Sequence, residues 1–568
     1  MTDNAIVTDQ LRGFLLEDVP TRGDGFSDFD PEHLELLSGL FRRLVRVADE
    51  GGAGDLDKLD AVLTVITQLK SVVDHHALQE GLLRFAAHHP VGRLIRVPRF
   101  AVRRASRVFK GGTPLLSTGV EQPLDWFRED LLYNEHHAHW HIIYRAGDLA
   151  DRQGELFVSM HRQMLARYEA ERVSLGLPPV VALFPYTTAI EAGHDPAIAG
   201  VGSRQPGRAL SAGVAAALVA QSAWVPQALA QRTVPTAGGS VMLPAAPTDA
   251  QQIAAVDAFG AQLELAPHNG GHGRLAQLST PQSGPMSSTD TAVRDPVFYQ
   301  WHRHIDDLAV AFENLMPPRD FASFDPGVEV SPVIVTPATN WDPQVDRHAW
   351  ATQTFGGANW DQDFGTAAPG TESFRTQFHI RDVPEAPLGL RFPIEDSFGH
   401  LDHEDFAWVV RVRNSGSTPK RVTVRIFLAP VTLADDRRMW IEMDRFAIDL
   451  LADERKAVFR QARESAVIRK RKGPADLIPD PFSEEDDTAE ADLYCECGWP
   501  RHLLIPSGAP DGLDVLVAVF VSGDDSVVPG AGRVCLAPIM PALADVDARA
   551  RAPSRRPSDR RERVHEAG

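Results

Sequence analysis

Cysteine is scarce in this sequence: 568 residues contain only three, Cys495, Cys497 and Cys535, all in the C-terminal part. A disulfide framework therefore cannot hold the chain together, although one bridge is open to it. Cys495 and Cys497 also lack the second cysteine pair that a structural zinc site needs. The fold must depend on buried apolar side chains, and a chain of this length is expected to form several cores.

Positively charged residues are also few: the chain has 57 Lys and Arg but 77 Asp and Glu, which gives a formal net charge of −20. Such a chain repels phosphates, which argues against nucleic acid or an anionic membrane as a partner. We find no span long and apolar enough to predict a membrane crossing. Residues 1–20 lack a basic end followed by an apolar run, so we predict no signal peptide and a cytoplasmic location.

Hydrophobic spacing divides the chain into predicted domains. Residues 1–115 and 116–325 carry Leu, Val and Phe at three- and four-residue spacing, which is typical of helices. Over residues 326–548, short runs of Val, Ile and Phe are bounded by turn residues, which predicts an antiparallel β-sandwich. Residues 549–568 mix Arg with Pro and Ser and predict a disordered basic tail. The predicted fold class is multidomain α+β.

Histidines are concentrated in the second of these domains. Two H-x-x-x-H pairs each place two imidazoles on one face of a helix, and each pair is followed by a further histidine on a later predicted helix. We therefore predict two three-histidine metal sites in the core of a four-helix bundle. The ligands of the first site are His137, His141 and His161, and those of the second are His268, His272 and His302.

Imidazole ligands suit copper, zinc, iron and nickel alike, whereas the absence of carboxylate or thiolate ligands argues against magnesium, calcium and iron–sulfur clusters. Copper is favoured over zinc because two Cu(I) ions together can give dioxygen two electrons. A single histidine in a helix is most often structural, and we interpret the neighbouring His136, His139 and His304 in that way, since they fall on other helix faces.

Around these histidines the chain resembles the arthropod hemocyanins and prophenoloxidases. HHAHWH at 136–141 and DRQGELFVSMHRQMLARYEAER at 151–172 resemble the first copper site of that family, and RDPVFYQWHRHID at 294–306 resembles the end of the second. RVTVRIFLAP and YCECGWPRHLLIPSG resemble its terminal domain. The resemblance implies an N-terminal all-α domain, a four-helix-bundle dicopper domain and a C-terminal immunoglobulin-like β-sandwich. It also implies that the two histidine trios hold two copper ions per chain.

The resemblance suggests roles for residues beside the metals. Asn269 would orient a water or a phenol oxygen near the second copper, and Asp290 would act as a base or else cap a helix. GDGFSDFD resembles a segment whose aromatic side chain can cover the copper pocket, so Phe26 or Phe29 is either a plug or a core residue. Family members usually have a bulky apolar residue where this chain has Gly270, which predicts room for a substrate.

The predicted function is that of a copper-dependent phenoloxidase, which binds dioxygen as side-on peroxide and oxidises phenols or catechols to ortho-quinones. Its partners would be dioxygen and a small phenolic or aminophenolic substrate, and the sequence is compatible with a homo-oligomer. Two alternatives stay open. One is a reversible oxygen carrier with the same six histidines, and the other is an ortho-aminophenol or arylamine oxidase in a biosynthetic pathway.

Overall fold

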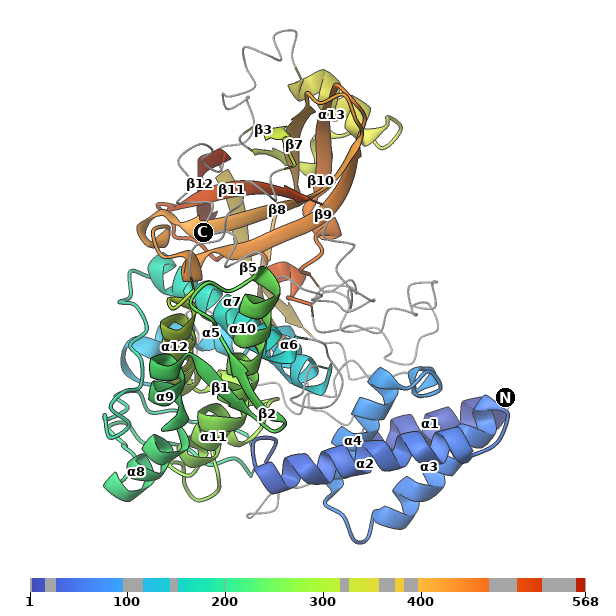
Figure 1. Cartoon of the computed structure of the whole chain (residues 1–568), viewed down its shortest axis with the longest axis vertical. Helices are drawn as coiled ribbons and strands as arrows, with labels where there is room; N and C mark the ends of the chain where they lie inside the picture. The colour runs from blue at the N-terminus through green and yellow to red at the C-terminus, as the bar shows by residue number, and fades with distance from the viewer. Residues whose placement is uncertain are drawn as a thin grey trace.

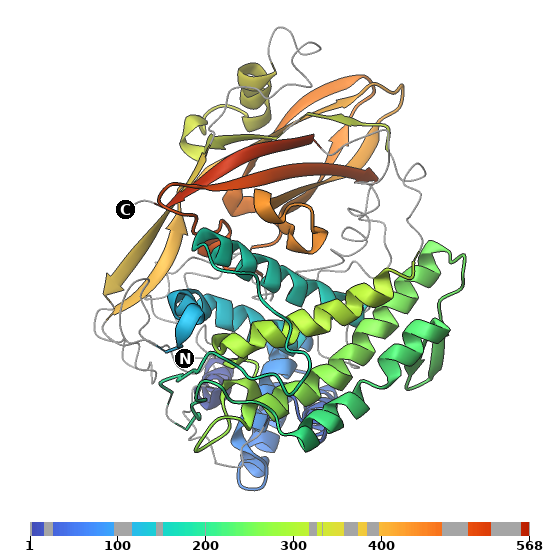
Figure 2. The same ribbon diagram turned by 90° about the vertical axis from the view of Figure 1, so that its left-hand side faces the viewer.

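The computed structural model of the chain describes residues 3–15, 27–95, 116–143, 152–198, 200–316, 326–331, 333–356, 373–382, 397–468, 498–523 and 558–566. Figures 1 and 2 show a group of N-terminal helices, a central helical domain and a C-terminal sandwich of strands. The predicted three-part organisation is confirmed. The expected boundaries fall in or beside the ranges 96–115, 317–325 and 524–557, which lie outside the described residues, as do all three cysteines.

The described residues of the N-terminal domain form the α-helices α1 (Asp3–Leu15), α2 (Pro31–Glu50), α3 (Asp55–Leu69) and α4 (His75–His88). Asp30 begins α2, because its carboxylate accepts hydrogen bonds from the backbone N–H groups of Glu32 and His33. Apolar side chains at three- and four-residue spacing then pack α2 against α3 and α4.

The central domain is built on helices that are buried on nearly every face. Its helices are α5 (Asp125–Arg128), α6 (Leu131–Ile143), α7 (Gln153–Ser174), α8 (Ala212–Gln221), α9 (Trp224–Gln231), α10 (Asp249–Leu263), α11 (Asn269–Ala276) and α12 (Pro296–Glu313), with a hairpin of β1 (Thr233–Thr236) and β2 (Gly239–Met242). The helix α7 runs through the middle of the domain and packs on α10 and α12. It also touches the sandwich, so it has no solvent face and no amphipathic stripe.

The C-terminal domain is a sandwich of two sheets. Its strands are β3 (Glu329–Val330), β4 (Ile334–Pro337), β5 (Ser373–Asp382), β6 (Ser397–His403), β7 (Phe406–Asn414), β8 (Lys420–Pro430), β9 (Ile441–Leu450), β10 (Glu454–Gln461), β11 (Leu513–Gly523) and β12 (Ser558–Glu566), with the helix α13 (Arg347–Phe355) packed on β10. One sheet has the order β10-β7-β3, with β4 also paired to β7, and the other has the order β6-β5-β12-β11-β8-β9.

Two expectations differ from the structure. The C-terminal tail is predicted to be disordered, yet β12 pairs with β11 and β5. An open strand edge offers backbone hydrogen bonds that the composition of a tail does not reveal.

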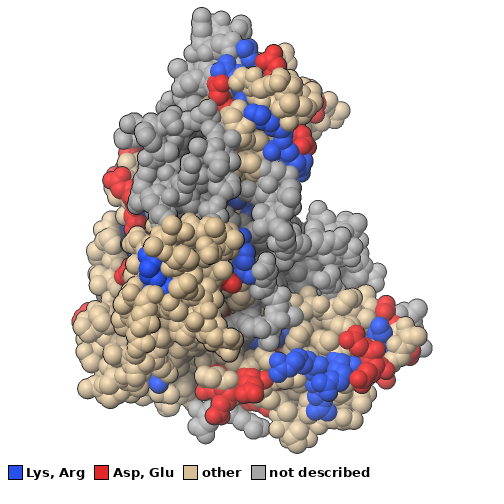
Figure 3. All heavy atoms as spheres, viewed as in Figure 1, with Lys and Arg blue, Asp and Glu red and all other residues tan. Residues whose placement is uncertain are grey.

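The second difference concerns membrane spans. The prediction that no segment is long and apolar enough to cross a membrane was wrong for Ala212–Gln231, by length and composition only, and 22% of the apolar window of this segment is buried. This stretch is divided between α8 and α9. Figure 3 shows few charged side chains over this part of the molecule.

The central domain is joined to the sandwich by a buried cation on α7. The Arg167 guanidinium donates hydrogen bonds to the carbonyl oxygens of Leu504 (3.1 Å) and Glu442 (3.1 Å) and lies 4.2 Å from the centre of the Trp499 ring. Glu442 is also buried, and its negative charge favours the charged form of Arg167, although burial lowers the Arg167 pKa to about 9. This interface therefore holds α7 in place.

We expect Arg167→Met to destabilise the protein by about 3 kcal/mol, because it leaves the buried carbonyl oxygens of Leu504 and Glu442 without their hydrogen-bond donor. The measurement is the midpoint of urea unfolding, followed by circular dichroism. The control is Arg421→Met, which breaks the exposed ion pair with Asp449 and should cost about 0–1 kcal/mol. Equal effects of the two changes would show that the buried arginine does not hold the interface.

Candidate metal centre

The predicted histidines come from four neighbouring helical segments of the central domain. α6 carries His137 and His141, and α7 and α12 carry His161 and His302. The other two stand on either side of a change in backbone: a short π-helical turn (Glu264–His268) ends at His268, and α11 then carries His272. All six rings are buried.

The six rings converge on one region. The ligand atoms of His137, His141 and His161 lie within 4.8 Å of one another, and so do those of His161, His268 and His302. The His272 ring centre is 4.6 Å from that of His268. The structure thus brings all six predicted residues together, but it places His161 between the two groups rather than within the first alone.

The hydrogen bonds of the rings fix which nitrogen faces the centre. The Nδ1 atoms of four histidines lie beside backbone carbonyl oxygens: His137 at 2.6 Å from Thr289, His161 at 2.9 Å from Phe157, His272 at 3.1 Å from Met286, and His302 at 2.7 Å from Phe298. His268 Nδ1 contacts Asn269 Oδ1 at 2.9 Å. A carbonyl oxygen only accepts, so Nδ1 carries the hydrogen and the lone pair lies on Nε2.

In the part of the chain that the structure describes, no hydrogen-bond donor faces these lone pairs. The Nε2 atoms of His137, His161 and His272 are buried and have no hydrogen-bond partner among the described residues. The Nε2 atoms of His268 and His302 face each other at 3.0 Å. Two lone pairs at that distance repel unless a cation lies between them, and imidazole nitrogens that share one metal are about 3 Å apart. The arrangement therefore fits two buried metal ions.

Burial also keeps the rings in the form that binds metal. Removal from water lowers the pKa of His137 to about 4 and that of His268 to about 3, because burial disfavours the charged imidazolium. The same cause lowers the pKa of His161, His272 and His302 well below the ordinary value. These five ligands are thus neutral at pH 7 and need to lose no proton when a metal binds.

The two glycines of the second pair have different surroundings. A Cβ on Gly271 would lie 2.0 Å from Cζ2 of Trp301, so glycine is what lets α12 approach α11. A Cβ on Gly270 would lie 2.1 Å from Oε1 of Gln221. Gly270 does line a cavity, but the direction of its missing side chain is filled by Gln221. The room for a substrate expected at this glycine is not present there.

Of the two candidate plugs, Phe29 lies over the site, whereas Phe26 lies outside the described residues. The Phe29 ring is stacked on His272, with centres 3.8 Å apart, and only 2% of the residue is exposed. Its neighbour Asp28 accepts hydrogen bonds from Ser288 Oγ (2.8 Å), Thr289 N (2.8 Å) and Thr289 Oγ1 (2.9 Å). The loop that orients His137 is therefore tied to the N-terminal segment, a contact that sequence reasoning missed.

Asn269 and Asp290 lie on the same side of the site. Asn269 contacts the His268 ring and therefore orients this metal-ligand histidine. It also lines two neighbouring cavities, so its side chain is next to open space. Asp290 is half-buried, and no described residue hydrogen-bonds its carboxylate. The helix-capping role that we considered for it belongs to Asp295, whose side chain accepts from Val297 N at the start of α12.

The neighbouring histidines face other partners. His304 Nε2 lies 2.9 Å from the Tyr186 hydroxyl, and His139 Nε2 lies 3.8 Å from Glu135. The His136 ring is 5.4 Å from Trp499 of the sandwich. These positions agree with the structural roles expected from the helix faces.

Comparison with known families places three matches along the chain. Residues 106–211 match the copper-containing domain of hemocyanin, and residues 212–315 match the common central domain of tyrosinase. Residues 379–531 match the immunoglobulin-like domain of hemocyanin. The first two matches meet within the central domain and together contain all six histidines.

Individual relatives include both carriers and oxidases. The chain is 26% identical to the hemocyanin D chain of Aphonopelma sp. over 90% of this chain and 84% of that protein. It is 30% identical to phenoloxidase subunit 2 of Bombyx mori over 71% of this chain and 60% of that protein. The crystal structure of AsqI with Zn has the same fold, with a TM-score of 0.70 and 20% identity over 99% of both chains.

The two glycines provide a test of how the second trio is held. Gly271→Ala should lower copper occupancy and stability, because the new methyl group meets the rigid Trp301 ring, with an expected cost of about 1–3 kcal/mol. Gly270→Ala meets only the flexible ends of the Gln221 and Arg274 side chains and should keep both metals. Metal analysis and thermal unfolding of both variants measure the difference. If Gly270→Ala is the more damaging change, the packing argument is wrong.

Proposed function

The chain belongs to the arthropod hemocyanin and phenoloxidase family of type 3 copper proteins, and from this premise we propose that it is a phenol-oxidising enzyme. The two histidine trios are consistent with the dicopper site of that family. Two copper ions held there would let dioxygen bind and accept the electrons that a phenol loses on oxidation.

A cavity lined by neighbours of both trios, among them Ala138 and Asn269 but none of the six ligand histidines, is the observation that carries this proposal. Its volume is about 690 Å³, and its walls include Phe29, Asn269 and Asp290. A carrier needs space for dioxygen alone, whereas volumes of roughly 300–1,000 Å³ are typical of sites for small organic molecules. This cavity supports a substrate that is larger than dioxygen.

The residues of the cavity wall give the substrate a defined orientation in this proposal. Asp290 takes the proton of the phenol hydroxyl, since no described residue hydrogen-bonds its carboxylate. Asn269 accepts from His268 through Oδ1, so its amide N–H groups are left to donate to the phenol oxygen. Phe29 bounds the space next to His272 and keeps water from the metals.

The alternative function, a reversible oxygen carrier, is favoured by one observation. Phe29 is stacked directly on a proposed ligand and is almost wholly buried, as a side chain that keeps substrates out would be. Both functions use the same ligands, so the experiment must follow the substrate as well as the oxygen.

Copper-loaded protein should hold two copper ions per chain and consume oxygen over many turnovers when a catechol is added, with quinone absorbance rising in step. Ortho-aminophenols and arylamines belong in the same assay.

His302→Ala should remove one copper and abolish turnover, because it removes a ligand of the second site. The matched control is His304→Gln on the same helix, which should keep both metals, since His304 faces Tyr186. Reversible oxygenation without quinone would establish the carrier, and binding of zinc in preference to copper would overturn the metal assignment.

Removal of the covering ring tests access separately. Phe29→Ala should raise kcat/KM for a catechol by about fivefold, which corresponds to roughly 1 kcal/mol of ring stacking removed. The control is Phe41→Ala, which removes a buried phenylalanine of the N-terminal core. An unchanged rate in Phe29→Ala, with copper retained, would show that Phe29 is a packing residue and not a barrier.

A further inference from the structure

Three of the six tyrosines of the chain are gathered in one buried cluster next to the metal centre. The Tyr168 and Tyr299 rings are stacked with centres 3.5 Å apart and an angle of 13° between their planes. The Tyr299 hydroxyl donates a hydrogen bond to the Tyr133 hydroxyl at 3.1 Å. The three rings, which are 0% exposed, therefore form a continuous path of phenols that we name the tyrosine relay.

The relay begins beside the ligands of both trios. Tyr133 stands one helical turn before His137 on α6, and Tyr299 stands three residues before His302 on α12. The Phe298 ring, next to Tyr299 in the chain, lies 5.2 Å from the His137 ring and 3.8 Å from the His302 ring. Only ring contacts through Phe298 and one helical turn separate the ligand rings from the first phenols.

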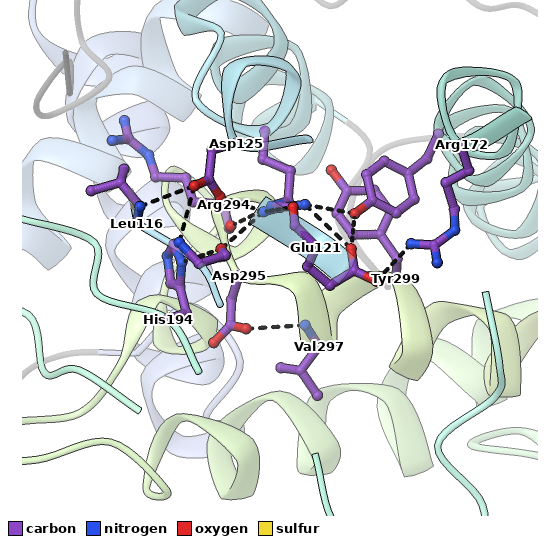
Figure 4. A network of polar contacts seen from close by, with 12 residues as sticks. Leu116, Glu121, Asp125, Arg172, His194, Arg294, Asp295, Val297 and Tyr299 are labelled. Atoms are coloured by element: carbon purple, nitrogen blue, oxygen red, sulfur yellow. Dashed lines mark hydrogen bonds and ion pairs between the residues drawn. The ribbon is translucent and has the colours of Figure 1, made fainter. Parts of the chain in front are cut away.

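The relay ends at a carboxylate. The Tyr168 hydroxyl donates to Glu121 Oε2 and accepts a hydrogen bond of 2.7 Å from Arg128 Nη1. Glu121 is also held by Arg172, as Figure 4 shows for this network of polar contacts. Burial raises the pKa of Tyr168 well above its ordinary value, so its phenol proton leaves only if a base takes it. Glu121 is placed to be that base.

We propose that the tyrosine relay discharges the oxidised metal centre when no phenolic substrate is present. One electron passes from the relay to the oxidised metals, and the radical comes to rest on Tyr168, whose proton moves to Glu121. The phenoxyl oxygen keeps its hydrogen bond from Arg128. Dioxygen is the oxidant. An external one-electron reductant such as ascorbate returns the electron to Tyr168 while Glu121 returns the proton, and a second pass delivers the second electron, so that the reduced dioxygen leaves as hydrogen peroxide with two protons from solvent.

The use of such a relay follows from the chemistry of the site. A buried centre that dioxygen has oxidised, and that finds no phenol, can only take electrons from the protein around it. Without a route for the electron, the nearest oxidisable groups are the ligand rings and Trp140, whose ring lies 5.1 Å from that of His141. A tyrosine whose proton acceptor is already in place gives up an electron more readily than these groups, so the relay protects the ligands.

The test uses the full-length copper-loaded protein, reduced, mixed with dioxygen without any phenol, and freeze-quenched for electron paramagnetic resonance. A tyrosyl radical should appear in the wild type. It should fall at least tenfold in Tyr168→Phe and in Tyr299→Phe. The second variant leaves the contacts of Tyr168 with Glu121 and Arg128 in place, and so keeps the test valid if Tyr168→Phe does not fold. Tyr186→Phe is the control, since Tyr186 contacts His304 outside the relay.

A second readout follows damage rather than the radical. Peptide mass spectrometry after repeated oxygenation should find more oxidised ligand histidine and Trp140 in Tyr168→Phe than in the wild type, while catechol turnover at the start is unchanged. The proposal rests on the function proposed above, and the two fail differently. Copper that stays reduced under dioxygen overturns the function and the relay with it. Copper that is oxidised without a tyrosyl radical, or with one that survives both Phe variants, overturns the relay alone.

Discussion

The orientation of the buried imidazoles is the constraint on which the rest of the site depends. Four rings donate from Nδ1 to backbone carbonyl oxygens, and His268 does so to the side chain of Asn269. A ring held in this way cannot turn its lone pair back toward the protein, so Nε2 must face the centre. The repulsion between these lone pairs is then relieved only by cations, which is why the site is one for metals and not a polar core that happens to contain histidines.

The acceptors of those hydrogen bonds link the site to the rest of the molecule. Phe157 and Phe298 lie one turn before His161 and His302 on the same helices, so these two rings are oriented locally. His137 depends instead on Thr289, whose loop is held by Asp28 of the N-terminal segment. The helix α7 in turn depends on the sandwich through Arg167. All three domains therefore contribute to the geometry of one centre.

The sequence predicts the parts of this arrangement that repeat with helical spacing, and it misses those that depend on contacts between segments. The His137–His141 spacing predicts one helix face, and the family resemblance predicts the fold. The role of Gly271 could not be predicted, because it depends on Trp301 coming from another helix. For the same reason the glycine at 270 predicts an opening, although Gln221 of α8 fills that direction. In the sandwich, β7 and β8 follow each other in the chain but belong to different sheets, which their composition does not reveal.

The same segment, Asp28 and Phe29, affects both access to the metals and the orientation of the ligand His137. Asp28 holds the loop that accepts from His137, and the next residue, Phe29, covers His272. A movement that lifts the ring away from the second trio therefore pulls on the loop that aligns the first. An open site with both trios intact requires that Phe29 leave its place by side-chain rotation while Asp28 stays bound to Ser288 and Thr289. The 690 Å³ cavity that borders Phe29 gives the ring a space to rotate into, so substrate entry and a fixed His137 are compatible in this fold.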